Sequence, residues 1–147
     1  MSEHIGTDYC LINSDRFIQQ NRPRFYWTNE KIDLTKLPER PKWDGKYFHL
    51  RRSYWRELKN GVSPCLTVSD CNEIYVESDT LNYTPLGDIK RRKLTPNECG
   101  LLQGLPNNYT EGVSNTQQYK MIGNGFTVPV IAWILKQMKV RNYENTI

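Results

Sequence analysis

The sequence lacks a long apolar run and an export signal. Its longest near-apolar stretch, Val128 to Leu135, contains Pro129 and falls far short of the roughly 20 residues that a membrane-spanning helix needs. The first residues do not combine a basic segment with an apolar one, as a secretory signal would. We therefore expect no membrane association and a cytoplasmic location.

Metal-binding residues are also scarce. The 4 cysteines (Cys10, Cys65, Cys71 and Cys99) form no Cys-x2-Cys pair and there are only 2 histidines, so we expect no metal site. An even cysteine number is compatible with disulfides, but in a chain of this size without an export signal we expect reduced thiols.

Size and charge point to one globular domain with a mild basic excess. The 147 residues include 24% charged and 37% hydrophobic side chains, and 20 Lys and Arg against 16 Asp and Glu give a net charge of +4. This charge is compatible with nucleic acid as a partner without demanding it.

Two short strands are expected near the N-terminus. The apolar run Tyr9 to Ile12 is typical of a strand buried on both faces, and Phe25 to Thr28 is rich in strand-forming aromatic residues. Because Pro23 disfavours helix at Arg22, we expect Arg22 and Arg24 to lie on an extended segment and to project the same way.

From Glu30 to Lys90 the hydrophobic periodicity disappears. Prolines and glycines recur among polar and aromatic residues, which predicts a small loop-rich insert. Short strands are expected within it at Cys65 to Val68 and Glu73 to Val76.

Helix signals follow the insert. Thr95 is a good N-cap, Pro96 suits the first helical position and Glu98 completes a capping box, so a helix is expected from Pro96 to Gln103, ended by Gly104.

Ser114 and Gln117 have the same capping spacing, which predicts a second helix that ends at Gly123. Asn124 and Gly125 then form a turn in which glycine tolerates a positive φ. Pro129 opens a last helix to about Val140. Its expected apolar face comprises Val128, Ile131, Ala132, Leu135 and Met138, widened by Val130, Trp133 and Ile134. The first strand and this helix need more burial than the chain offers, which implies a partner.

Three segments together resemble the DNA (cytosine-5)-methyltransferase family. Gln20-Asn21-Arg22-Pro23-Arg24 is similar to the eighth of the family's ten motifs, residues 92–106 to the ninth and residues 118–130 to the tenth. They occur in the family's order, with a variable insert between the first two.

The resemblance implies an α/β fold. Residues 1–29 would end the catalytic domain, 30–91 would form the target recognition region, and 92–147 would return to the catalytic domain. The chain would supply a strand and helices that complete a Rossmann-like, S-adenosylmethionine-dependent domain.

The resemblance also assigns roles around the target base. Arg24 would reach the flipped cytosine or its phosphate, supported by Arg22 and Gln20. Without the family, a solvated pair of arginines at a strand edge is the simpler interpretation.

Asn124 and its neighbour Gly125 would contact the methionine part of S-adenosylmethionine. Many family members have serine where this chain has Gly125. The simpler interpretation is an ordinary turn between helices.

DNA contacts are expected in the insert and next to the ninth motif. Lys90 and Arg91 are candidates for phosphate contact, with a solvated charge run as the alternative. Within the insert, the candidates are Arg51, Arg52 and Arg56, whose aromatic neighbours are also typical of a small core. The ninth motif would organise the recognition region through Arg92, Thr95, Pro96, Glu98, Gln103 and Gly104.

The family's catalytic residues are missing from the sequence. It contains no Pro-Cys-Gln nucleophile motif, no Glu-Asn-Val acid motif and no Phe-x-Gly-x-Gly cofactor loop. Pro64-Cys65 keeps the nucleophile's dipeptide, but Leu66 follows it and it lies between the eighth and ninth motifs, so Cys65 is not expected to be the nucleophile.

We therefore expect the C-terminal part or subunit of a split enzyme. It would act on double-stranded DNA with an N-terminal half or subunit and would be inactive alone. Its place would be bacterial, phage or nucleoid-associated, or nuclear in a eukaryote. The alternative is a non-catalytic DNA-binding or regulatory remnant that keeps Arg22, Arg24 and the basic cluster.

Overall fold

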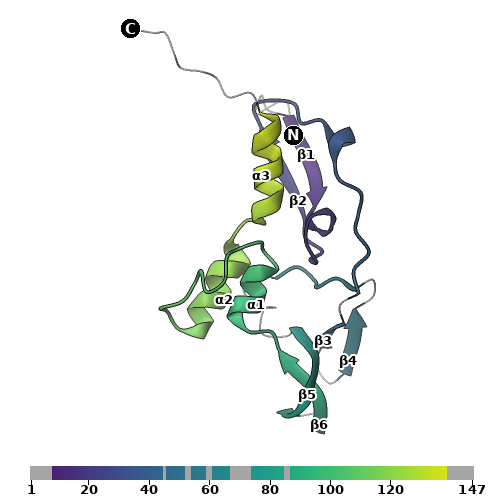
Figure 1. The fold of residues 1–147 in the computed structure, drawn as a ribbon, viewed down its shortest axis with the longest axis vertical. Coiled ribbons are helices and arrows are strands. Elements are labelled where there is room, and N and C mark those ends of the chain that lie inside the picture. The colour runs from purple at the N-terminus through teal and green to yellow at the C-terminus, as the bar shows by residue number, and fades with distance from the viewer. Residues whose placement is uncertain are drawn as a thin grey trace.

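The computed structural model describes residues 8–138, except for 45, 52–53, 59–60, 67–73 and 85–86. Within this part the chain forms an elongated mixed α/β structure (Figure 1). A β-hairpin and helix α3 lie at one end and a four-stranded sheet at the other, with helices α1 and α2 between them.

The hairpin consists of β1 (Asp8–Asn13) and β2 (Pro23–Thr28), which pair antiparallel. The short 3-10 helix η2 (Ser14–Arg16) follows β1. One face of the hairpin packs against α3 (Val128–Gln137). The buried residues of this core are Cys10, Ile12, Tyr26, Ile32, Val130 and Ile134.

Strand β1 is buried on one face only, so the expectation of burial on both faces is wrong. Cys10 and Ile12 are buried, whereas Tyr9 is 55% and Leu11 51% exposed. Side chains alternate across a strand, and only the face toward α3 is covered by the described residues.

The expected buried face of the last helix is also wrong. Val130 and Ile134 are buried, whereas Val128, Ala132 and Leu135 are exposed. The first half of α3 is apolar on most sides, so its pattern did not single out the side that packs on the hairpin.

The insert begins with the 3-10 helix η3 (Leu34–Lys36) and contains more strand than expected. Strands β3 (Tyr47–Arg51), β4 (Tyr54–Leu58), β5 (Ile74–Thr84) and β6 (Gly87–Lys93) form an antiparallel sheet in the order β4-β3-β5-β6.

The strand expected at 73–76 is the start of the longer β5, and Cys65 and Leu66 are not in a strand. The other two residues of that expected strand, 67 and 68, lie outside the described residues. The length of β5 comes from pairing with β6, in which charged residues face each other at Glu77 and Arg91. Such polar strands carry no hydrophobic alternation to reveal them.

Helix α1 (Pro96–Leu101) confirms the predicted capping box: the Thr95 side chain accepts from Glu98 N–H, and the Glu98 carboxylate accepts from Thr95 N–H. Gly104 then adopts φ +76°, as predicted. Helix α2 (Asn115–Asn124) begins at the predicted Ser114 cap but ends one residue later than expected. Gly125 has φ −70°, so the turn does not use a left-handed glycine.

A second core joins the insert to α1 and α2. Its buried residues are Tyr47, Leu66, Leu94, Cys99, Tyr119 and Ile122. The described cysteines, Cys10, Cys65 and Cys99, are free thiols. No helix among the described residues is long and apolar enough to cross a membrane.

Candidate functional site

Arg22 lies at the centre of the site and holds three segments together. Its side chain is buried, with 7% of the residue exposed. Nη1 donates to the Leu66 carbonyl at 2.8 Å, while Nη2 donates to the carbonyls of Gly123 and Gly125, both at 3.0 Å. The guanidinium therefore links the start of β2 to the insert and to the end of α2.

Gln20 lies two residues earlier and is fully buried. Its backbone forms a parallel bridge with Ser63, and its carbonyl accepts a hydrogen bond from the Ser14 hydroxyl at 2.6 Å. Among the described residues, neither polar atom of its side-chain amide has a hydrogen-bond partner. Gln20 thus supports the backbone that carries Arg22 and Arg24.

Arg24 is exposed and is held at Cys65. Its Nη2 donates to the Cys65 sulfur at 3.0 Å, and Nη1 donates to the Pro23 carbonyl at 2.8 Å. Arg22 Nη1 also lies 3.5 Å from the same sulfur. Both guanidinium groups therefore meet one thiol of the insert, with Arg22 inside and Arg24 toward solvent.

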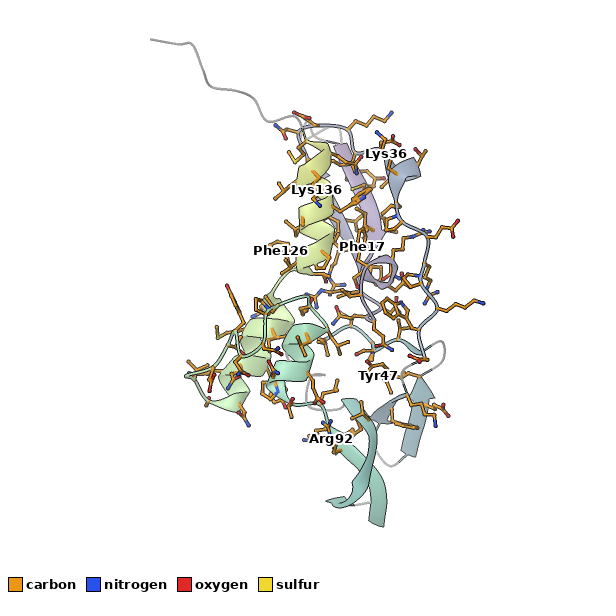
Figure 2. The ribbon with its side chains drawn as sticks, viewed as in Figure 1. Phe17, Lys36, Tyr47, Arg92, Phe126 and Lys136 are labelled. Atoms are coloured by element: carbon orange, nitrogen blue, oxygen red, sulfur yellow. The ribbon has the colours of Figure 1, made fainter. Side chains whose placement is uncertain are left out.

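The loop after α2 presents an exposed amide on a fixed backbone. Asn124 is exposed, and its neighbours Gly123 and Gly125 supply the two carbonyls that accept from Arg22. A carboxamide both donates and accepts hydrogen bonds, so Asn124 suits a polar ligand such as an amino acid moiety. Phe126, which is 71% exposed, follows near the beginning of α3 (Figure 2).

Gln103 fixes the same loop from the other side. This buried side chain donates to the Ile122 carbonyl at 3.1 Å and accepts from the Thr127 hydroxyl at 2.9 Å. Its carbonyl accepts from Val128 N–H, at the first residue of α3. The ninth and tenth motifs are therefore bonded to each other on both sides of Asn124.

Arg92 and Glu98 form the joint between β6 and α1, where Figure 2 places Arg92. The guanidinium donates to both carboxylate oxygens, at 2.8 and 2.6 Å. Hydrogen bonding to Arg92, with further bonds from Thr95, lowers the pKa of Glu98 to about 2. The same ion pair raises the pKa of Arg92.

The remaining candidate DNA contacts lie in the four-stranded sheet. Arg51 ends β3, Arg56 lies in β4, and Lys90 and Arg91 lie in β6. Arg52 is outside the described residues, and so are the side chains of the other four. Among the described residues, no group of three or more His, Cys, Asp and Glu could hold a metal ion.

Sequence reasoning missed the partners that Arg22 and Arg24 share. The Cys65 sulfur and the Leu66 carbonyl come from a stretch without regular structure, and the Gly123 and Gly125 carbonyls carry no side-chain signal. Only the eighth motif itself, with two arginines on one extended segment, pointed to this place.

Comparison with known proteins fits this geometry. Residues 18–140 match the family of C-5 cytosine-specific DNA methylases. The chain is 34% identical over 119 residues to the Type II methyltransferase M.Bsp6I of Bacillus sp. strain RFL6, covering 78% of this chain and 36% of that protein. It is 39% identical over 157 residues to the Type II methyltransferase M.MspI of Moraxella sp., covering 90% and 38%.

A plant protein is also similar. The DNA (cytosine-5)-methyltransferase DRM2 of Oryza sativa subsp. japonica is 38% identical over 156 residues, covering 88% of this chain and 26% of that protein. The fold and the match define a mixed α/β fragment of a methyltransferase domain. The chain belongs to the C-5 cytosine-specific DNA methylase family, whose members bind DNA and use S-adenosylmethionine. It spans about a third of the length of these relatives.

Proposed function

We propose that this chain is the C-terminal part or a separate subunit of a DNA (cytosine-5)-methyltransferase. In this role it contributes DNA recognition and part of the S-adenosylmethionine site, and a polypeptide with the catalytic cysteine supplies the rest. The observation that carries the proposal is the Arg22 side chain, which binds the eighth motif, the insert and the tenth-motif loop into one unit. A non-catalytic remnant would not need this unit intact.

The residues divide between base and cofactor. Arg24 extends from the unit into solvent, where it can reach a flipped cytosine or its phosphate. Asn124 and Gly125 contact the methionine part of S-adenosylmethionine, which supplies the methyl group for C5 of cytosine. Arg22 orients that loop and Gln20 supports the strand, so neither needs to touch a substrate.

The insert serves as the target recognition region. Its sheet carries Arg51, Arg56, Lys90 and Arg91, and the Arg92–Glu98 pair holds the sheet to α1. Phosphate contact by Lys90 and Arg91 implies that replacing both with alanine lowers the salt dependence of DNA binding by about two counterions.

The catalytic domain is completed by the partner. The hairpin is a two-stranded sheet and the chain covers 26–38% of its relatives' length. In a complete Rossmann-like domain the hairpin extends a larger sheet. Without the motifs that carry the nucleophile and the acid, the chain transfers no methyl groups alone.

The first experiment is native purification of the tagged chain from its source cell, followed by mass spectrometry. We expect a stoichiometric partner, or a longer form of the same polypeptide, with Pro-Cys-Gln and Glu-Asn-Val motifs. The assembled enzyme should methylate DNA, and Asn124→Ala should reduce that activity. Recovery of the folded chain alone, or an activity indifferent to Asn124→Ala, favours the non-catalytic remnant. Methyl transfer by the purified chain would refute its dependence on a partner.

A further inference from the structure

The outer face of the hairpin is apolar and uncovered by the described residues. Tyr9 pairs with Trp27 and Leu11 pairs with Phe25, so these side chains form one patch on the face away from α3. Each is 51–55% exposed. Ring centroids lie 5.7 Å apart for Tyr9 and Phe25 and 6.1 Å apart for Phe25 and Trp27. A patch of this kind marks a protein contact site.

A groove runs along β2 on the side away from β1. It has a volume of about 570 Å³ and is lined by residues 25–29 together with the exposed side of α3. A sheet face presents every second residue of a strand, whereas five consecutive residues line a strand edge. The groove therefore follows the free backbone edge of β2. Its far wall is formed by Phe126, Ile131, Leu135 and Met138.

The groove and the patch together specify what would fill them. A strand paired with β2 would place alternate side chains against the apolar wall of α3. Its other side chains would extend the apolar patch of Phe25 and Trp27. Such a strand must be apolar on both faces, as strands in the middle of a sheet covered by helices are.

We propose that the free edge of β2 is where the rest of the methyltransferase docks, by adding a near-continuously apolar strand to the hairpin. An amphipathic helix of the same polypeptide then covers the patch of Tyr9, Leu11, Phe25 and Trp27. The proposal rests on the proposed function and deepens it, because the occupant is the polypeptide that supplies the missing two thirds of the relatives' length. It also places the contact at β2, although the first strand of the chain is β1.

Helix α3 explains why this edge is suited to a partner. Leu135 is 59% and Phe126 71% exposed, and both line the groove. The apolar stripe of α3 that points away from the hairpin core thus has a role once the added strand is in place. Pro23 lacks a backbone N–H and begins β2, so pairing starts after it.

Hydrogen exchange tests the proposal on the native complex, or on the longer polypeptide, obtained as above. Backbone amides within residues 24–29 should be strongly protected there and exchange faster in the isolated chain. Leu135→Glu should weaken assembly about tenfold or more, because a buried leucine contact is replaced by a charge.

The matched control is Met121→Glu, which replaces a 51% exposed methionine on α2 outside the groove and should leave assembly within about twofold of wild type. Thermal unfolding of each isolated variant verifies that it still folds. If Leu135→Glu unfolds the chain, the exchange of the wild-type β2 amides decides.

The outcomes separate this proposal from the proposed function. An active complex in which residues 24–29 exchange as in the free chain, or in which both variants assemble alike, overturns the docking edge and leaves the proposed function standing. A homodimer of the chain with protected β2 amides overturns it in favour of a second copy. Absence of any methyltransferase assembly overturns both.

Discussion

Arg24 Nη2 donates a hydrogen bond to the sulfur of Cys65 across 3.0 Å, which joins the exposed arginine of the eighth motif to the insert. The thiol positions the guanidinium without being a nucleophile. In the assembled enzyme, Cys65→Val should reduce methyl transfer about tenfold, since a misplaced binding group costs rate, and Cys65→Ser should retain most of it.

The comparison is made by steady-state kinetics with DNA as the varied substrate, which separates KM from kcat. Complete loss of activity in Cys65→Ser as well as Cys65→Val would instead assign Cys65 a chemical role. Equal, full activity of both variants would show that Arg24 needs no such support.

Arg22 should matter for stability far more than Arg24 does. Arg22→Ala leaves the carbonyls of Leu66, Gly123 and Gly125 without their donor in a buried place. We expect the free energy of unfolding to fall by about 3 kcal/mol, measured by urea denaturation of the isolated chain. Arg24→Ala is the control and should cost less than about 0.5 kcal/mol, because its side chain is exposed. Equal losses would contradict the central role of the buried Arg22 side chain.

The ion pair of Arg92 and Glu98 predicts a pH dependence. The pKa of Glu98 is lowered from 4.5 to about 2 in the folded chain, so its contribution to stability is complete above pH 4.5 and is lost as the pH falls toward 2. Arg92 and Glu98 are 38% and 33% exposed, so solvent screening limits the contribution to about 1 kcal/mol.

The measurement compares thermal unfolding of wild type and Glu98→Gln between pH 2 and pH 7. The difference in stability should be constant above about pH 5 and should disappear near pH 2. A difference that does not change with pH would mean that the pair contributes through packing alone.

Gly104 should resist replacement because two constraints act on it. Its φ is +76°, and a Cβ there would lie 2.5 Å from Pro129 Cδ and 2.9 Å from Pro129 Cγ. Gly104→Ala should therefore destabilise the chain by about 2 to 3 kcal/mol. Gly112→Ala is a matched control, since Gly112 has φ +101° but a Cβ there would meet no atom within 4 Å. It should cost about 1 kcal/mol, from backbone strain only. Urea denaturation of both variants gives the steric share by difference.

The parts that sequence reasoning predicted well are those set by neighbouring residues. Thr95, Pro96 and Glu98 start α1 through bonds within one turn, and Gly104 ends the following turn in the expected conformation. The strand at Phe25 to Thr28 was visible from its aromatic composition. The resemblance also led to the correct family, because the eighth, ninth and tenth motifs are contiguous in sequence.

The parts that failed depend on distant contacts. Which side of α3 is buried is decided by Cys10 and Tyr26 of the hairpin, more than 100 residues away in sequence from Val130 and Ile134. The length of β5 is decided by its pairing with β6. The burial of Arg22 depends on carbonyl groups, which a list of residue types does not display.

The open edge of β2 and its aromatic patch also bear on how this chain is produced in a cell. An unpaired strand edge beside half-exposed aromatic side chains is a template for aggregation. A surplus of the chain over its partner should therefore aggregate or be degraded, and its synthesis has to be matched to that of the partner. Recombinant yield should rise when the partner is expressed from the same transcript, an effect of dosage on solubility.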